Sequence, residues 1–253
     1  MLKENTVHLG DCLDLMPSIP SKSVDMILCD LPYGTTDCSW DSIIDLSVLW
    51  QQYERVIKDN GAIVLTANRR FTFALYNSNP KIYRYKWIYL KSLKTNFLNA
   101  NKQPLCQHEE VLIFYKNQPC YNPQMTKGKP YKREHPNSKL SGDSVYINDQ
   151  LIRSTTENNG DYFPSDVIQF KQHNGFTWHP TQKPVALFEY LIKTYTNEGE
   201  LILDNCSGSG TTAIACMNTN RRFICIERDE TYHRKSIERM NNHEPLFHLG
   251  GKC

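Results

Sequence analysis

The stretch between Glu200 and Glu227 limits the fold of this chain more than any other part of its sequence. It reads in order as an apolar strand, a loop of small residues, a helix and a second apolar strand, at residues 200–204, 205–210, 211–218 and 222–226. Further strands and helices of similar length alternate along the chain. This alternation predicts an α/β fold with a largely parallel sheet that helices cover on both faces.

The loop of this unit carries a glycine pattern typical of nucleotide cofactors. Gly208-Ser209-Gly210, followed by Ala213, matches the dinucleotide fingerprint in its Gly/Ala form. Glu227 ends the second strand at about the 20-residue spacing expected of an acid that binds ribose hydroxyls. The unit therefore predicts a cofactor with an adenosine half.

A second motif, Asp30-Leu31-Pro32-Tyr33, follows the apolar run at residues 24–29. It places a carboxylate, a rigid proline with its flanking carbonyls and an aromatic plane at the carboxyl end of a predicted buried strand. Ligands bind at that edge of an open α/β sheet. A flat substrate with an amino group needs these parts, since they provide acceptors for both amino hydrogens and a ring to stack on. The natural substrate of this type is a nucleobase.

Together the two motifs resemble those of the amino-group DNA methyltransferases, in particular the beta class, in which the catalytic motif precedes the cofactor loop. Residues 30–33 are similar to the family's Asp-Pro-Pro-Tyr signature, with Leu31 at its second position. Residues 204–212 are similar to its S-adenosylmethionine loop, with Asn205-Cys206 in place of the usual Pro-Phe.

Further matches extend the resemblance over nearly the whole chain. The run His179-Pro180-Thr181-Gln182-Lys183-Pro184 matches the segment that precedes the cofactor loop in the family. Weaker matches occur at Gly10-Asp11 and from His108 to Lys116. Only residues from roughly 117 to 175 lack a counterpart.

The resemblance implies a Rossmann-like class I S-adenosylmethionine-dependent methyltransferase fold with a mostly parallel, seven-stranded sheet. Residues 1–116 would form the catalytic half of the domain and residues 176–253 its cofactor-binding half. Residues 117–175 are too long for a structureless loop in a compact domain, so we expect a small appended module or a binding element, with a disordered surface insertion as the alternative. By the resemblance, this segment would be the inserted target-recognition region.

By the same resemblance, the chain would transfer a methyl group from S-adenosylmethionine to the 6-amino group of adenine, flipped out of duplex DNA. Asp30 and the Leu31 carbonyl would accept the amino hydrogens, beside Pro32, and Tyr33 would stack on the base. The cofactor would contact the residues that match the family's binding motifs: Asp11, Asp30, His179, Thr181, Asp204, Asn205, Cys206, Ser207, Gly208, Ser209, Gly210, Thr211 and Glu227.

Within this set, Glu227 would bind the ribose hydroxyls and Asp11 the adenine or ribose region. Asp204 and the glycine loop would shape the pocket for the methionine portion. His179 and Thr181 would line the methionine end, with a structural role in a turn as the alternative.

Three other functions are compatible with parts of the sequence. Methylation of the 4-amino group of cytosine needs the same acceptors and aromatic plane, although the resembled cytosine enzymes more often carry Ser at the position of Asp30. A nicotinamide-dependent oxidoreductase would use the glycine loop but leaves residues 30–33 unexplained. A catalytically inactive DNA-binding protein would not need an intact Asp30 and Gly208.

The charge distribution indicates a polyanionic partner, although the net charge is only +2. No Asp or Glu occurs from Asn60 to His108, and aromatic residues are interleaved there with Arg69, Arg70, Lys81, Arg84, Lys86, Lys91, Lys94 and Lys102. This mixture suits a phosphate backbone and exposed bases, while a solvated face over an aromatic core is the alternative. The resemblance implies that this polyanion is double-stranded DNA. The resemblance admits a homodimer and a companion restriction endonuclease without fixing either.

Composition adds several expectations about the environment. The chain has no apolar run near 18 residues and no signal-peptide pattern at its start, so we expect a cytoplasmic protein with no membrane association. The resemblance implies a prokaryotic or phage origin. Nine scattered cysteines without a Cys-x-x-Cys pair are interpreted as reduced thiols. The eight dispersed histidines predict no metal site.

Overall fold

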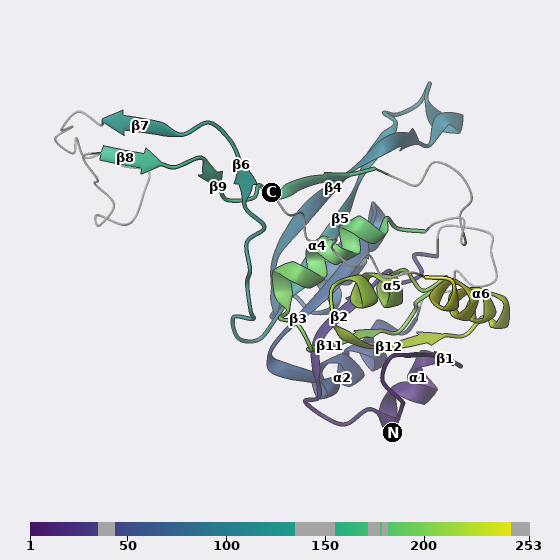
Figure 1. The fold of residues 1–253 in the computed structure, drawn as a ribbon. Helices are drawn as coiled ribbons and strands as arrows, with labels where there is room; N and C mark the ends of the chain where they lie inside the picture. The colour runs from purple at the N-terminus through teal and green to yellow at the C-terminus, as the bar shows by residue number, and fades with distance from the viewer. Residues whose placement is uncertain (35–43, 135–154, 172–177, 179–181, 244–253) are drawn as a thin grey trace. The chain divides into compact units, whose positions relative to one another are not determined.

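The computed structural model describes residues 1–34, 44–134, 155–171, 178 and 182–243 (Figure 1). The chain divides into two compact units, one formed by Met1–Asn122 with Asp166–Cys253 and the other by Pro123–Ser165. The strands of the larger unit are β1 (Thr6–Leu9), β2 (Val24–Cys29), β3 (Ile57–Ala67), β4 (Tyr83–Thr95), β5 (Cys106–Phe114), β10 (Val167–Phe170), β11 (Leu201–Asp204) and β12 (Arg222–Glu227). Its helices are α1 (Cys12–Leu15), α2 (Leu46–Val56), α3 (Arg70–Ser78), α4 (Val185–Tyr195), α5 (Thr211–Asn218) and α6 (Glu230–Asn241), with 3₁₀ turns η1 (Met16–Ser18) and η2 (Phe97–Asn99).

The eight strands form one sheet in the order β1-β12-β11-β2-β3-β5-β4-β10. Neighbours from β1 to β3 are parallel, β5 is antiparallel to β3 and to β4, and β10 is parallel to β4. The predicted mostly parallel α/β fold is therefore confirmed. The sheet has eight strands instead of the expected seven, because β10 adds an edge strand from inside the predicted insertion.

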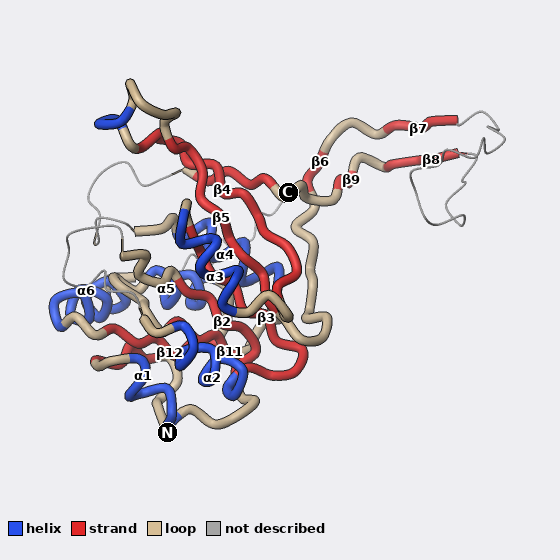
Figure 2. Tube along the Cα trace, turned by 180° about the vertical axis from the view of Figure 1, so that it is seen from behind, coloured by secondary structure: helices blue, strands red, loops and turns tan. Residues whose placement is uncertain are grey.

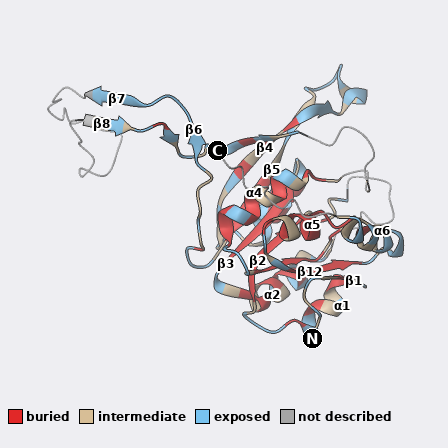
Figure 3. Cartoon of the chain, in the orientation of Figure 1, coloured by how far each residue is buried: buried red, intermediate tan, exposed pale blue. Residues whose placement is uncertain are grey.

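The central strands are buried on both faces (Figure 3). Along β2, Ile27 and Cys29 join the apolar cluster beneath α1, α2 and α3, whereas Met26 and Leu28 join the cluster beneath α4 and α5. Successive side chains of a strand point to opposite faces, so one apolar run supplies two layers of core. This explains why β2 reads as a continuous apolar segment.

The chain changes direction across the sheet between β2 and β11. From β2 the chain passes through α2 to β3 on one side, and from β11 it passes through α5 to β12 on the other. In open α/β sheets such a switch point leaves a crevice at the carboxyl ends of the strands. Asp30, Asp204 and Glu227 all stand at this edge, directly after or at the ends of β2, β11 and β12.

The strands β4 and β5 form a long hairpin that continues beyond the other strands, with η2 at its tip (Figure 2). Both strands are longer than the apolar-patterned runs at residues 85–91 and 111–115. The remaining residues of the two strands are exposed or only partly buried, so no apolar alternation marks them in the sequence.

The smaller unit contains four short strands that pair as two antiparallel ribbons. β6 (Thr126–Lys127) pairs with β9 (Asp161–Tyr162), and β7 (Tyr131–Glu134) pairs with β8 (Thr155–Asn158). This unit falls inside the predicted insertion but is narrower, because residues up to 122 and from 166 onward belong to the larger unit. Of the helices described in either unit, none has the length and hydropathy needed to cross a membrane.

A buried hydroxyl of α4 connects that helix to the β4 strand. The Tyr195 hydroxyl accepts a hydrogen bond from Trp87 Nε1 at 2.7 Å and lies 2.9 Å from the Tyr85 hydroxyl. Tyr195 and Trp87 are both buried. A buried indole N–H without a partner is costly, so this contact should contribute measurably to stability.

We expect Tyr195→Phe to lower the free energy of unfolding by about 1–3 kcal/mol, because it leaves the Trp87 N–H unpaired. Tyr85→Phe is the matched control, since it removes a hydroxyl from the same cluster and keeps the contact between Trp87 and Tyr195. Urea unfolding of both variants measures the difference. Equal losses in the two variants would contradict the importance of the indole contact.

Candidate active site

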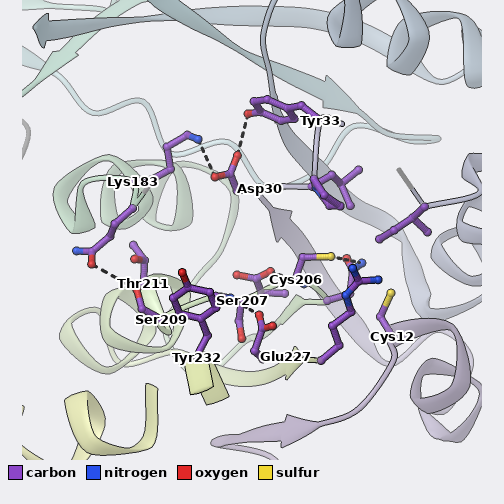
Figure 4. Close-up of a pocket in the computed structure, with 18 of the residues that line it drawn as sticks. Cys12, Asp30, Tyr33, Lys183, Cys206, Ser207, Ser209, Thr211, Glu227 and Tyr232 are labelled. Carbon is purple, nitrogen blue, oxygen red and sulfur yellow. Dashed lines mark hydrogen bonds and ion pairs between the residues drawn. The ribbon is translucent and has the colours of Figure 1, made fainter. Parts of the chain in front are cut away.

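A cavity lies at the carboxyl ends of β2, β11 and β12 (Figure 4). Of the predicted site residues that the structure describes, all except Gly210 line it: Asp11, Asp30, Leu31, Pro32, Tyr33, Asp204, Asn205, Cys206, Ser207, Gly208, Ser209, Thr211 and Glu227. His179 and Thr181 lie outside the described residues. The fold therefore brings the two motifs, which are more than 170 positions apart in the sequence, to one cavity.

Three side chains donate hydrogen bonds to Asp30 at the wall of this cavity. Its Oδ1 accepts hydrogen bonds from the Tyr33 hydroxyl at 2.8 Å and from the Thr66 hydroxyl. Its Oδ2 accepts one from Lys183 Nζ at 2.7 Å. A carboxylate offers about four acceptor positions, so three contacts hold the group in place and leave room for a further donor.

Lys183 belongs to a buried chain of alternating charges. Its Nζ also lies 3.2 Å from Glu109 Oε2, and Glu109 Oε1 lies 3.2 Å from Lys91 Nζ. Burial alone would lower the pKa of Lys183, but the negative charges of Asp30 and Glu109 outweigh it and hold this pKa well above its usual value. Lys183 is therefore a cation in this site, and two acids balance two lysines within the cluster.

Tyr33 is held between a ring and two polar groups. Its ring stacks on Phe71 of α3, with centroids 5.0 Å apart and planes inclined by 30°. Lys183 Nζ lies 5.5 Å from the centre of the Tyr33 ring. Burial, reinforced by the charge of Asp30, raises the pKa of the Tyr33 hydroxyl well above its usual value, so the hydroxyl stays protonated and can donate to Asp30.

Leu31 departs from the family's signature, and its side chain lies in the core. It is buried and packs in the apolar cluster beneath α1, α2 and α3. A leucine side chain at this position thus contributes to the core. No cis peptide bond is found among the described residues, which include the turn at Pro32.

Glu227 connects the end of β12 to the glycine loop. Its Oε2 accepts the backbone N–H of Gly208 at 2.7 Å, and its Oε1 accepts that of Asp229 at 2.8 Å. Burial raises the pKa of this carboxyl, opposed by backbone hydrogen bonds from Gly208, Arg228 and Asp229. Each oxygen retains acceptor capacity, so the group can receive hydroxyl donors from a ligand.

The residues at the start of the loop replace the usual Pro-Phe with polar contacts. Asn205 Oδ1 accepts a hydrogen bond from the buried Tyr53 hydroxyl of α2 at 2.6 Å. The Cys206 thiol contacts the thiols of Cys12 and Cys29, and these contacts together with burial hold its pKa well above the usual value. Asn205 and Cys206 therefore connect the loop to the core beneath it.

Ser207 and Gly210 were both expected to contact the cofactor, but the structure places them differently. The Ser207 hydroxyl is buried and has no hydrogen-bond partner among the described residues, and its side chain lines the cavity. Gly210, by contrast, begins α5 with φ +77°, and a Cβ there would lie 3.0 Å from Ser236 Cβ of α6. The glycine thus permits close packing of α5 against α6, and it does not line the cavity.

Asp11 lines the cavity and also caps a helix. Its carboxylate accepts the Leu13 N–H at 2.8 Å and so begins α1. A capping role uses one carboxylate oxygen and leaves the other open to the cavity or to solvent. The weak sequence match at Gly10-Asp11 therefore falls on residues of the cavity wall.

Several cavity residues were missed by the sequence analysis, namely Gly10, Cys12, Ile44, Gln182, Lys183, Phe188, Arg228 and Tyr232. Gln182 and Lys183 belong to the family match at residues 179–184, so this match could have indicated them as site residues. Thr66 contacts Asp30 from β3, and Glu109 contacts Lys183 from β5. Glu109 lies in the weaker family match from His108 to Lys116, whereas no local pattern marks Thr66. In the part of the chain that the structure describes, no group of three His, Cys, Asp or Glu residues could hold a metal ion.

Comparisons with known proteins identify DNA methyltransferases over most of the chain. A family model described as "DNA methylase" matches residues 24–238. The chain is similar to the type II methyltransferase M.BglII of Bacillus subtilis, with 26% identity over 90% of this chain and 66% of the relative. It is also similar to the type II methyltransferase M.HpaI of Haemophilus parainfluenzae, with 25% identity over 92% of this chain and 73% of the relative.

Solved structures share the fold. A complex of M1.HpyAVI with S-adenosylmethionine aligns with a TM-score of 0.63 and 22% identity, covering 93% of this chain and 98% of that one. The PvuII DNA methyltransferase, described as cytosine-N4-specific, aligns with a TM-score of 0.66 and 16% identity, covering 94% and 87%. At these identities the likeness shows the fold alone.

Asp204 generates a prediction about pH. Burial raises its pKa from 3.8 to about 7, opposed by hydrogen bonds from Thr212 and from the Cys206 N–H. Because the folded-state pKa lies above the unfolded value, ionisation opposes folding: the favourable contribution is complete below pH 4 and is lost as the pH rises through 7. The total loss is roughly 4 kcal/mol at most.

We therefore expect the unfolding free energy of Asp204→Asn, relative to that of the wild type, to be higher at pH 8 than at pH 4.5. Urea unfolding of both proteins at the two pH values measures this change. A difference in unfolding free energy that is the same at both pH values would contradict the raised pKa.

Proposed function

The chain belongs to the DNA methylase family that acts on N6 and N4 amino groups, and from this premise we propose that it methylates the 6-amino group of adenine in duplex DNA with S-adenosylmethionine. The observation that carries the proposal is the single cavity that Asp30 and the loop from Asp204 to Thr211 share. Methyl transfer requires the acceptor nitrogen and the methyl donor to meet in one place, and this geometry permits it.

The residues of the cofactor half fit S-adenosylmethionine. Glu227 has acceptor capacity for ribose hydroxyls, and the buried Ser207 hydroxyl has no partner among the described residues. The similar protein M1.HpyAVI was solved with the same cofactor. When bound, S-adenosylmethionine supplies a methyl group activated by its positively charged sulfur.

Asp30 would act on the amino group of the target base. The lone pair of an aromatic amine is delocalised into the ring, so two acceptors on its hydrogens are needed to localise that pair on nitrogen. The fourth acceptor position of the Asp30 carboxylate would take one hydrogen, and the Leu31 carbonyl would take the other. Breaking the sulfur–methyl bond would release S-adenosylhomocysteine and leave the nitrogen with positive charge and one surplus proton. The negative Asp30 would stabilise that charge until the proton is lost to solvent.

Lys183 would keep Asp30 in the required position. Its Nζ binds Oδ2 while Tyr33 and Thr66 bind Oδ1, so the carboxylate cannot rotate without losing partners. Tyr33, which lines the cavity, would also stack on the flipped base. Base stacking on an aromatic side chain contributes roughly 1–3 kcal/mol.

Recognition of the DNA sequence would reside in the smaller unit, Pro123–Ser165. Its ribbons carry exposed lysines paired with acids, Lys127 with Asp161 at 2.5 Å and Lys132 with Glu157 at 2.6 Å. Exposed pairs of this kind contribute little to stability and can exchange their partners for phosphates. Similarity to type II methyltransferases also supports a companion restriction endonuclease.

Methylation of the 4-amino group of cytosine is the second candidate. It is favoured by the TM-score of 0.66 with PvuII, a cytosine-N4-specific enzyme. The same acceptors and the same ring would serve this reaction. Asp30 favours adenine, because the cytosine enzymes of the resembled family more often carry Ser at that position.

A labelling experiment tests both the methylated base and the role of Asp30. Duplex DNA is incubated with methyl-labelled cofactor, digested to nucleosides and separated by chromatography. We expect label in N6-methyladenine, and we expect Asp30→Ala to lose at least about a hundredfold in rate, as when a group that stabilises transition-state charge is removed. Calorimetry should show cofactor binding retained.

Asp59→Ala is the control, because it removes an exposed carboxylate near the opposite end of β3. Label in N4-methylcytosine would contradict the proposed base. Equal loss in the two variants, or no loss in either, would contradict the role of Asp30.

A further inference from the structure

The tip of the β4–β5 hairpin, residues 92–105, presents large apolar side chains to solvent. Leu93 is 61% exposed, Phe97 is 66% exposed and Leu98 is fully exposed. A cluster of this kind on one loop is unusual for a surface that meets only water. We call these residues, with η2 between the strands, the hairpin tip.

The hairpin tip extends from the same edge of the sheet as the active site. At that edge Ala67, the last residue of β3, is level with Glu110 of β5 and, through it, with Ile88 of β4. β4 continues from Ile88 to Thr95, a distance of roughly 20 Å at the usual rise per residue. The tip therefore stands beyond the carboxyl ends of the strands, on the side where Asp30 faces the cavity.

The charges around the hairpin tip suit a polyanion. Lys94 and Lys102 flank the apolar residues and are exposed, and neither forms an ion pair within the described part of the chain. Arg69 and Arg70 leave β3 at the same edge and are also exposed. No acid occurs from Asn60 to His108, so nothing on the hairpin tip would repel a phosphate backbone.

The hairpin tip is ordered by its own hydrogen bonds. Asn96 adopts a left-handed conformation with φ +74°, and its Oδ1 accepts the Asn99 side-chain amide at 2.8 Å. The backbone N–H groups of Ala100 and Lys102 bind the carbonyls of Phe97 and Asn99 at 3.0 and 2.9 Å. A loop shaped in this way holds Phe97 and Leu98 outward without a further loss of conformational freedom on binding.

The base of the hairpin, at Lys91 and Glu109, contacts the ion pair between Lys183 and Asp30. Lys91 of β4 and Glu109 of β5 pair with each other, and Glu109 also contacts Lys183, which binds Asp30. These buried contacts fix the direction of the hairpin relative to the cavity, because breaking them would leave charges unpaired.

We propose that the hairpin tip enters the base stack of duplex DNA beside the target nucleotide. Phe97 and Leu98 occupy the space that the flipped base vacates, and Lys94 and Lys102 contact phosphates on either side. Apolar side chains that insert between bases in this way lower the cost of unstacking. This inference rests on the proposed function, since the wedge fills the space left by a base that the enzyme removes from the helix.

The test compares methyl transfer to two duplexes. The target site is first mapped by sequencing DNA that the wild-type protein has methylated, and duplexes are then made with the target base either paired or mismatched. We expect the double variant Phe97→Ala with Leu98→Ala to lose about tenfold or more in rate on the paired duplex. On the mismatched duplex, where the base leaves the helix more readily, its rate should lie within about threefold of the wild type.

Two variants serve as controls. Phe73→Ala removes a phenyl ring of similar exposure, 68%, from α3 and should leave both rates unchanged. Leu98→Met keeps an apolar side chain at the tip and should retain most of the rate on paired DNA. Fluorescence of 2-aminopurine at the target position gives a second readout, which should rise less with the double variant than with the wild type.

Each other outcome overturns the inference. An unchanged rate on paired DNA would show that the tip does not act on the base, and an equal loss on both duplexes would show a general contact without a wedge. A wild-type dimer that sedimentation shows to become a monomer in the double variant would make the tip an interface between two copies. Absence of methyl transfer by the wild type would overturn the proposed function itself and the inference with it.

Discussion

The ion pair between Asp30 and Lys183 is the interaction on which the rest of the site depends. Lys183 is 9% exposed, and a buried cation is stable only when anions neutralise it. Asp30 supplies one anion and Glu109 the other, and Glu109 in turn holds Lys91. One cluster of charges thus fixes the end of β2, the segment before α4 and the base of the β4–β5 hairpin relative to each other.

The topology of the sheet explains why this cluster meets the cofactor loop. β2 and β11 are adjacent, but the helices that follow them cover opposite faces, so the chain leaves a crevice where the two strands end. Asp30 and Asp204 stand on its two sides. The buried, alternating core of β2 makes the crevice rigid, and a rigid crevice can align a nitrogen with a methyl group.

The sequence predicted most of the fold, because the buried strands and amphipathic helices carry strong apolar patterns. The family match confirms the expected class, an S-adenosylmethionine-dependent methyltransferase of DNA amino groups, while the choice of adenine remains a proposal. β10 was missed because a short edge strand has a weak pattern, and Lys183 because its partner Asp30 is 153 positions away. The cofactor contact expected of Gly210 stays a prediction, and its φ and its closeness to Ser236 show a packing role that the sequence does not reveal.

The central claim is that one cavity holds the cofactor between Glu227 and Asp30. A crystal structure of the protein with S-adenosylhomocysteine, the cofactor without its methyl group, tests it most directly. The account predicts ribose hydroxyls within hydrogen-bond distance of the Glu227 carboxylate, a contact from Ser207, and the sulfur facing Asp30 and the Leu31 carbonyl. A ligand bound elsewhere, or one whose sulfur points away from Asp30, would contradict it.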